Sequence, residues 1–198
     1  MAFDEFSVQL SGQEPTWLTQ VREEAWERFE RQGFPTTDQE DWKYTNVAPV
    51  ARGKFRPISG ENKSIDELIN LDAYADQESL QSRLVFINGI CSRELSSLQA
   101  LPAGVVVTDL ATALQGEHAH TLREKLALKV DGNEDGFQSL NTAFLRDGAF
   151  LLIPQGVKVE TPILLLFLTT KSETLSSPRV IVIAERESAA TLIETYAA

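Results

Sequence analysis

Apolar residues in the first part of the chain recur with the period of a helix. Over residues 14–32 one stands at every fourth position, which predicts a helix with a single apolar face on a core. This stripe consists of Trp17, Val21, Ala25 and Phe29, and Leu18 and Trp26 widen it. Further helices are predicted at 64–71, 109–115, 117–129 and 135–146. The first part of the chain is therefore predicted to be mainly helical.

Polar residues mark where two of the shorter elements are expected to begin. Thr37 and Glu40 have the spacing of a capping box, which predicts a short helix over 41–44. Thr108 is the predicted N-cap of the helix at 109–115. Residues 48–60 contain two prolines and two glycines, and they are predicted to form an extended connection.

Strand signals begin at residues 84–87 and dominate after Gly148. Asn88-Gly89 separates two apolar runs and predicts a β-hairpin, because both residues tolerate the positive φ of its tight turn. Further short β-branched or aliphatic runs lie at 105–107, 149–153, 157–159, 163–168, 180–184 and 191–196. Polar or proline-containing turns separate these late runs, and no helical period fits between them.

Residues 163–168 are apolar at every position. Such a strand must be covered on both faces, because neither face offers side chains that favour water. Closely spaced strands of this kind, with no helix between them, are typical of a parallel β-solenoid or of the middle of a β-sandwich.

The net charge of the chain limits the kinds of molecule that it is expected to bind. The 198 residues include 18 Lys and Arg against 29 Asp and Glu, which gives a net charge of −11 at pH 7. Such a surface repels phosphate backbones and anionic lipids, so neither nucleic acid nor a membrane is an expected partner. Residues 1–6 lack the basic and apolar regions of a secretory signal, and a cytoplasmic protein is expected.

Candidate reactive or metal-binding side chains are few. His118 and His120 are the only histidines, and their i,i+2 spacing places them on different sides of a helix, so a metal site is not expected. Cys91 is the single cysteine, which excludes a disulfide framework. It follows the Asn-Gly turn in an apolar run, and is expected to be a buried structural thiol.

Two further groups are weighed as sites. Residues 131–136 begin like a calcium loop, but Thr142 stands where the bidentate glutamate belongs, so a solvated linker is expected. Trp42 and Tyr44 are expected to pack the short helix onto the first one, because aromatic side chains bury large areas, rather than to form a binding platform.

Three segments carry a resemblance to a known family. They are residues 33–47 (GFPTTDQEDWKYTNV), 86–96 (FINGICSRELS) and 140–157 (LNTAFLRDGAFLLIPQGV). In order and spacing they resemble the N-terminal part of the SufD branch of the SufB/SufD family, from the SUF system of iron–sulfur cluster assembly. The resemblance covers nearly the whole chain.

The resemblance implies an α+β fold, in which an N-terminal helical domain leads into a right-handed parallel β-helix. We expect a helical domain with a small β-hairpin over residues 1–100, a mixed strand and helix connection over 101–148, and the first coils of the β-helix over 149–198. The chain is expected to end early in that β-helix. Its open end predicts self-association into a homo-oligomer.

The resemblance also implies a function. The chain would be a scaffold subunit that supports cluster assembly and iron acquisition with a SufB-like sister subunit and a SufC-like ATPase, contacted mainly through regions beyond residue 198. It is not expected to be an enzyme. No catalytic, cofactor-binding or metal-ligating residue is assigned, because one thiolate cannot supply the four ligands of a cluster. A cluster and a reduced flavin are expected only at the level of the whole complex.

Two other classes of protein remain as alternatives. A carbohydrate-active β-solenoid enzyme needs charged residues clustered in a groove, whereas residues 149–168 carry only Lys158 and Glu160. An isolated sandwich-type binding module needs alternating apolar and polar positions, and residues 163–168 do not alternate.

Overall fold

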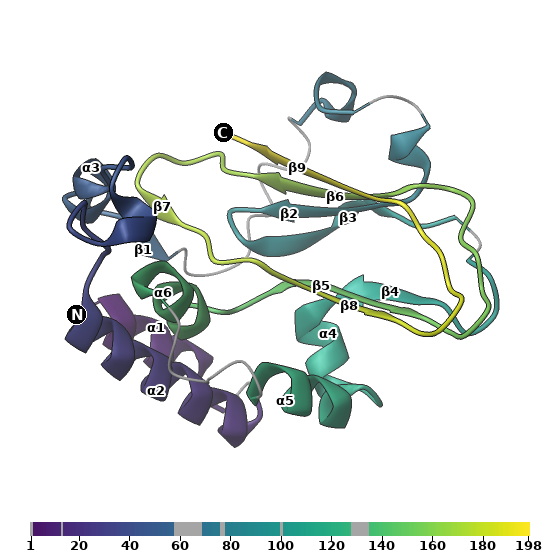
Figure 1. Cartoon of the computed structure of the whole chain (residues 1–198). Coiled ribbons are helices and arrows are strands. Elements are labelled where there is room, and N and C mark those ends of the chain that lie inside the picture. The colour runs from purple at the N-terminus through teal and green to yellow at the C-terminus, as the bar shows by residue number, and fades with distance from the viewer. Residues whose placement is uncertain (1, 13, 58–68, 76–77, 100, 128–134) are drawn as a thin grey trace. The chain divides into compact units, whose positions relative to one another are not determined.

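The computed structural model describes residues 2–12, 14–57, 69–75, 78–99, 101–127 and 135–198, and it combines helices with β-sheets in an α+β fold (Figure 1). The chain divides into two units. A helical unit comprises Met1–Ser59, Leu114–Leu145 and Glu173–Ser177, and a sheet unit comprises Gly60–Ala113, Arg146–Ser172 and Pro178–Ala198. Both units join segments that are distant in sequence, and the three-part division along the chain remains a prediction.

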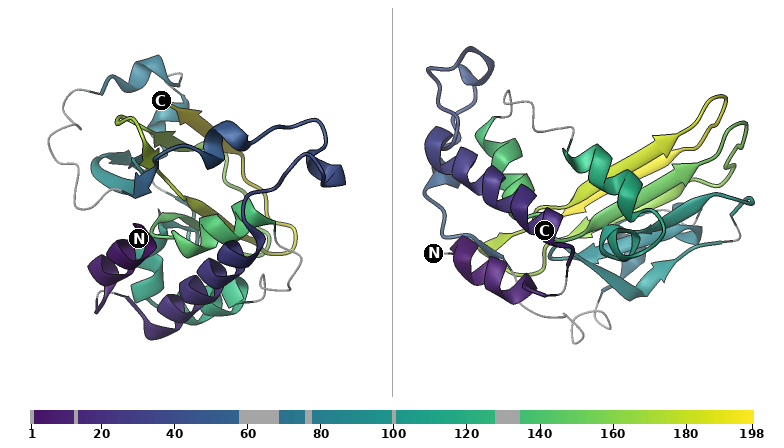
Figure 2. Two further views of the ribbon diagram at one scale, coloured as in Figure 1. Left: turned by 90° about the vertical axis from the view of Figure 1, so that its left-hand side faces the viewer. Right: turned by 90° about the horizontal axis from the view of Figure 1, so that it is seen from below.

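The helical unit is built around α2 (Thr16–Gln32), which packs along α6 (Gly136–Ala143). The unit also contains α1 (Ala2–Leu10), α3 (Ala48–Ala51), α5 (Ala119–Ala127) and the short parallel pair β1 (Arg56–Pro57) and β7 (Thr174–Leu175). One cluster of its core consists of Phe3, Phe6, Leu10, Ala25, Ala143 and Phe144. Helices were predicted over the ranges of α2, α5 and α6 but not over that of α1. Figure 2 shows α1, α2 and α6 together.

The buried face of α2 overlaps the predicted stripe only in part. Leu18 and Ala25 of the stripe are buried, whereas its other members are partly buried, and Arg22 and Arg28 are buried although they were not predicted to be. Arg22 can be buried because it forms an ion pair with Glu14 and its Nε donates a hydrogen bond to the Leu145 carbonyl at 2.6 Å. Apolar periodicity could not reveal this face, since it treats arginine as a solvent-facing residue.

The predicted start and length of the elements after Pro35 were wrong. The 3-10 helix η1 spans Glu40–Trp42 and begins after Gln39 with no side-chain cap, so Thr37 and Glu40 do not form a capping box. Residues 48–60 were predicted to be extended, but α3 forms within them. Asn46 Oδ1 accepts the N–H of Ala48 at 3.0 Å, and a proline is tolerated in the first turn of a helix.

Two sheets form the sheet unit. One has the strand order β3-β2-β6-β9, with β2 (Arg83–Ile87), β3 (Ile90–Ser97), β6 (Ile163–Leu168) and β9 (Leu192–Ala197). The other has the order β4-β5-β8, with β4 (Val106–Asp109), β5 (Gly148–Ile153) and β8 (Arg179–Ala184). The predicted β2–β3 hairpin is present, and its turn residues Asn88 and Gly89 have φ of 52° and 84°.

From β5 onward the chain alternates between the two sheets. β5 pairs in parallel with β8, with Gly148 opposite Arg179, and β6 pairs in parallel with β9, with Ile163 opposite Leu192. Successive rounds are therefore offset by roughly 30 residues. The predicted strand at 157–159 is replaced by an isolated parallel bridge between Lys158 and Ala189, so the connections also lie in register.

β6 is covered on both faces, as predicted from its sequence. All six residues are buried. One face packs against residues of the β4-β5-β8 sheet in a core that includes Phe86, Leu151, Ile163, Leu165 and Phe167. The other face contributes Leu164, Leu166 and Leu168 to a second cluster, which Leu80 of the short 3-10 helix η4 (Ser79–Gln81) and Leu71 of η3 (Leu71–Ala73) help to cover.

Aromatic rings stack across the β2-β6-β9 pairing. Phe86, Phe167 and Tyr196 stand opposite one another in register, and each neighbouring pair has ring centroids 4.8 Å apart. The rings are nearly parallel, at 16° and 14°. Such stacking favours in-register pairing, because a slip by one residue would move each ring to the opposite face.

Among the described residues β9 pairs with a strand on one side only, so the 198-residue chain is predicted to self-associate through the other edge of β9. In the parallel β6–β9 ladder the N–H of Ile163 donates to the Thr191 carbonyl and the N–H of Thr169 donates to the Ala197 carbonyl. Backbone groups of successive residues in a strand point to opposite sides, so the N–H of Glu194 points away from β6. An open edge of this kind pairs readily with another strand. We expect concentration-dependent association in light scattering, and we expect Glu194→Pro to reduce it because proline removes the outward donor without breaking the β6 ladder. Glu194→Gln, which keeps the N–H, should associate like the wild type; a wild-type protein that stays monomeric at high concentration would contradict this.

Candidate functional site

The Asp147 carboxylate is the most connected buried charged group of the sheet unit. Asp147 is buried, with only 4% of its surface exposed. Oδ2 accepts the N–H of Cys91 at 2.9 Å, and Oδ1 accepts those of Ala111 at 3.2 Å and Gly148 at 2.8 Å. These donors belong to β3, to the first turn of α4 (Leu110–Gln115) and to β5. One carboxylate thus ties together three elements that are distant in sequence.

Gly148, which follows Asp147, is constrained by its backbone conformation and by a close neighbour. Gly148 has φ of 150°, and a Cβ built on it would lie 2.0 Å from the Arg179 carbonyl oxygen of β8. The Asp147 carbonyl in turn accepts the N–H of Arg179 at 3.2 Å. Only glycine permits this close approach, so the Asp147-Gly148 pair fixes both the buried acid and the start of β5–β8 pairing.

Burial sets the protonation of this centre. It raises the pKa of Asp147 to about 6; the three backbone N–H donors oppose the shift and the nearby Asp109 adds to it. Burial, followed by the negative charge of Asp147, raises the pKa of the Cys91 thiol to about 12. Burial also lowers the pKa of Arg146. The cysteine is therefore held as a neutral thiol at neutral pH, which makes it a weak nucleophile.

The sequence interpretation assigned Cys91 a structural role but did not single out Asp147. The structure places Cys91, partly buried, beside the core between the two sheets, with its backbone N–H bonded to Asp147. Asp147 could have been noticed as an acid directly before a glycine at the start of an apolar strand. Its three partners lie at positions 91, 111 and 148, and no local pattern relates the first two to it.

The cap of α4 differs from the predicted one. Asp109, not Thr108, accepts the N–H of Thr112 at 2.8 Å. The helix therefore starts one residue later than expected, at Leu110, because Thr108 still belongs to β4. A carboxylate at this position also suits the positive end of the helix dipole.

The histidines do not converge. His118 is 20% exposed in its side chain and lies 3.5 Å from Glu117, whereas His120 is 83% exposed and lies 3.8 Å from Glu124. Asp135 belongs to the segment that was considered as a calcium loop, but it caps α6 by accepting the N–H of Gln138 at 2.9 Å. The other residues of that segment before it, 131–134, lie outside the described part of the chain. Among the described residues, no three His, Cys, Asp or Glu side chains gather as they would around a metal ion.

Trp42 and Tyr44 do not act together. The Trp42 ring packs against Phe137 of α6, with ring centroids 5.4 Å apart. Tyr44 is 92% exposed, so the prediction that it packs the short helix onto α2 was wrong. The turn after η1 leaves Tyr44 beside Lys43, whose Nζ lies 5.7 Å from the centre of the Tyr44 ring.

The family follows from comparison with known proteins. A family profile described as the SufBD protein N-terminal region matches residues 2–165. The chain belongs to the SufB/SufD family. It is 33% identical to an iron–sulfur cluster assembly SufBD family protein of Synechocystis over 96% of its own length and 41% of that relative. The match includes both Asp147 and Cys91 within its bounds.

Both branches of the SufB/SufD family are represented among the relatives. The chain is 31% identical to the iron–sulfur cluster assembly protein SufD of Bacillus subtilis, over 93% of the chain and 42% of that protein. It is 25% identical to SufB of the same organism, over 92% of the chain and 40% of that protein. The chain thus spans about two-fifths of the length of these relatives. None of its described helices is long and apolar enough to cross a membrane.

We expect Asp147 to make stability depend on pH. Its folded pKa of about 6 exceeds the ordinary 3.8, so the folded protein retains a proton that the unfolded chain releases. The bound proton therefore stabilises the folded state fully at pH values below the unfolded pKa, and this stabilisation is lost as pH rises through about 6. It contributes roughly 3 kcal/mol to the free energy of unfolding. Urea unfolding between pH 4 and pH 7 measures it. Asp147→Asn should flatten this part of the profile, and an unchanged slope would contradict the assignment.

We expect Cys91 to react slowly with disulfide reagents. At pH 8 a thiol with a pKa of about 12, against an ordinary 9.0, is ionised roughly a thousandfold less. The native rate should therefore lie far below that of the urea-unfolded chain. Asp147→Asn should raise the native rate by removing the neighbouring negative charge. Equal rates in native and unfolded protein would rule out a protected thiol.

Proposed function

We propose that the protein is a non-catalytic scaffold subunit of the SUF system of iron–sulfur cluster assembly. The observation that carries the proposal is the family match over residues 2–165, together with the likeness to SufD over nearly the whole chain. Its partners are a SufB-like sister subunit and a SufC-like ATPase, and it supports cluster assembly and iron acquisition with them. The cluster and its iron are cargo of the assembly.

We also infer that β5, β6, β8 and β9 form the first coils of a right-handed parallel β-helix. The alternation between two sheets, the in-register pairing of β5 with β8 and of β6 with β9, and the stacked aromatic rings support this architecture. Stacked coils form a stiff rod, which suits a scaffold because it holds partners at fixed separations.

The proposed role requires no chemistry from this chain. The Asp147 carboxylate is engaged by three backbone donors, and the Cys91 thiol is held protonated. A cluster and a reduced flavin belong to the whole complex rather than to these residues. The relatives are more than twice as long, so most partner contacts are assigned to their remaining parts. The proposed location is the cytoplasm, although one relative is the chloroplastic protein ABCI7 of Arabidopsis thaliana.

No specific observation favours either of the two alternative classes of protein. A carbohydrate-active solenoid enzyme would need accessible charged residues clustered in a groove, whereas Asp147 is only 4% exposed and accepts hydrogen bonds from three backbone N–H groups. A sandwich-type module would need a water-facing side on its strands, whereas β6 is buried at every position.

A chimera tests the proposal. We would replace the matching part of Bacillus subtilis SufD by this chain and express it in cells that lack their own SufD. The chimera should purify with SufB and SufC and restore iron–sulfur enzyme activities. A control chimera with Gly148→Val should fail, because its side chain would collide with the Arg179 backbone. A folded chimera that recovers neither partner would overturn the proposal.

A further inference from the structure

Residues 43–56 reverse the charge of the molecule locally. This basic segment contains four of the chain's 18 Lys and Arg and none of its 29 Asp and Glu. The four are Lys43, Arg52, Lys54 and Arg56, and all are exposed. Lys43 lies 3.9 Å from the exposed Glu40, so the local excess of positive charge is carried chiefly by Arg52, Lys54 and Arg56.

The basic segment also exposes large apolar side chains. Tyr44 is 92% exposed, and Val50 and Phe55 are each 43% exposed. Exposed apolar side chains with charged neighbours are typical of protein interaction sites, where aromatic side chains and arginine are enriched. The proposed scaffold role does not use this segment, so its composition needs another explanation.

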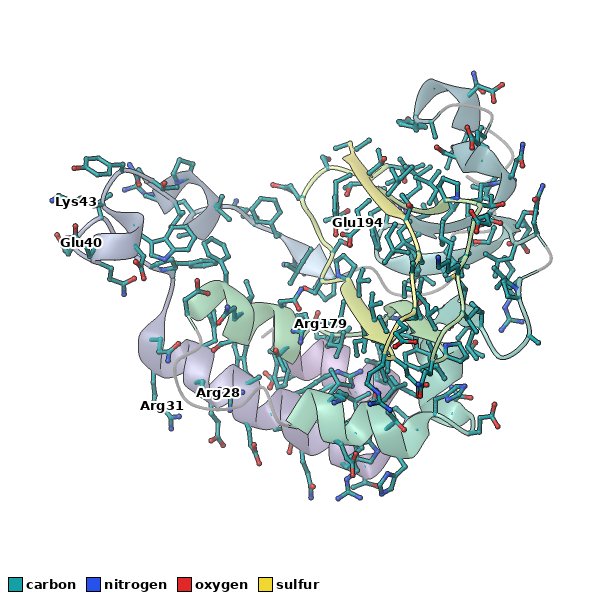
Figure 3. The ribbon with its side chains drawn as sticks, turned by 45° about the vertical axis from the view of Figure 1, so that its right-hand side comes forward. Arg28, Arg31, Glu40, Lys43, Arg179 and Glu194 are labelled. Carbon is teal, nitrogen blue, oxygen red and sulfur yellow. The ribbon has the colours of Figure 1, made fainter. Side chains whose placement is uncertain are left out.

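Contacts at both ends hold the basic segment in place. Just before it, Trp42 packs on Phe137 at 5.4 Å. At its end, Arg56 pairs with Thr174, and its N–H donates to the Glu173 carbonyl at 2.9 Å. Figure 3 shows Glu40 and Lys43 at the outer end of this part of the helical unit, away from Arg28 and Arg31 of α2.

The exposed Phe55 ring is positioned as well. A Cβ on Gly53 would lie 2.1 Å from the ring atom Cε2, so the ring rests directly against the glycine backbone. Anchored ends and a positioned ring reduce the conformational entropy that a partner must remove on binding. These features distinguish the segment from an unstructured basic loop.

We propose that the basic segment binds a short acidic segment, bearing apolar side chains, on a partner protein. A broad polyanion such as duplex DNA or an anionic membrane would also meet the acidic remainder of the chain and be repelled. A narrow acidic segment can approach within the Debye length of about 8 Å without that repulsion. Its apolar side chains would cover Tyr44, Val50 and Phe55.

An NMR titration of the isotope-labelled chain tests this. The probe is a synthetic peptide of Glu and Leu residues, and its control carries Gln in place of Glu. We expect saturable shifts confined to residues 43–56, a sub-millimolar Kd for the acidic peptide and a Kd about tenfold weaker for the control. The affinity should fall as salt is added.

Variants separate the basic segment from general charge effects. Lys54→Glu, and Tyr44→Ser combined with Phe55→Ser, should each weaken binding about tenfold. Lys125→Glu and Tyr74→Ser make matched changes at exposed positions elsewhere and should leave Kd unchanged. Equal effects of the two sets would overturn the proposal. So would failure of the acidic peptide to bind, or binding of duplex DNA or phosphatidylglycerol vesicles through the segment in its place.

Discussion

Burial of β6 on both faces is the constraint on which the rest of the sheet unit depends. Its six residues carry no group that gains from contact with water, so both faces must be covered. The β4-β5-β8 sheet supplies one cover, and the residues around η3 and η4 supply the other. Pairing on both edges follows, because a buried strand also needs partners for its backbone N–H and C=O groups. β2 on one side and β9 on the other provide them.

Asp147 stabilises the point at which the two-sheet arrangement begins. The first strand of the series, β5, starts at Gly148 beside β8, β3 and the start of α4. Several backbone N–H groups meet there away from water and need acceptors. One carboxylate with two oxygens accepts three of them. Burial is costly for the charge and raises its pKa to about 6, yet the centre fixes the geometry of the first coil.

Local patterns predicted the elements better than the contacts between them. The alternation of strands and turns after Gly148, the Asn88-Gly89 hairpin and the two-sided burial of residues 163–168 could be read directly, because each depends on neighbouring residues. The burial of arginines on α2 could not, because Arg22 is buried through contacts with Glu14 and Leu145. Tyr44 was misjudged for a related reason: aromatic residues usually bury, and only the path of the chain after Trp42 shows that this one does not.

A scaffold acts through the positions it fixes, and this has consequences for where its interactions can lie. The reactive groups of the sheet unit are withdrawn from solvent: the thiol of Cys91 is protonated, and Asp147 is enclosed by backbone donors. The basic segment has the opposite properties, since its cations and aromatic rings face water and its ends are anchored. Exposed aromatic side chains also occur in the sheet unit, where Tyr196 is 62% exposed, so exposure alone does not mark a site of recognition. The basic segment differs because its aromatic rings lie among cations and between two anchored ends, and our proposal therefore places recognition there.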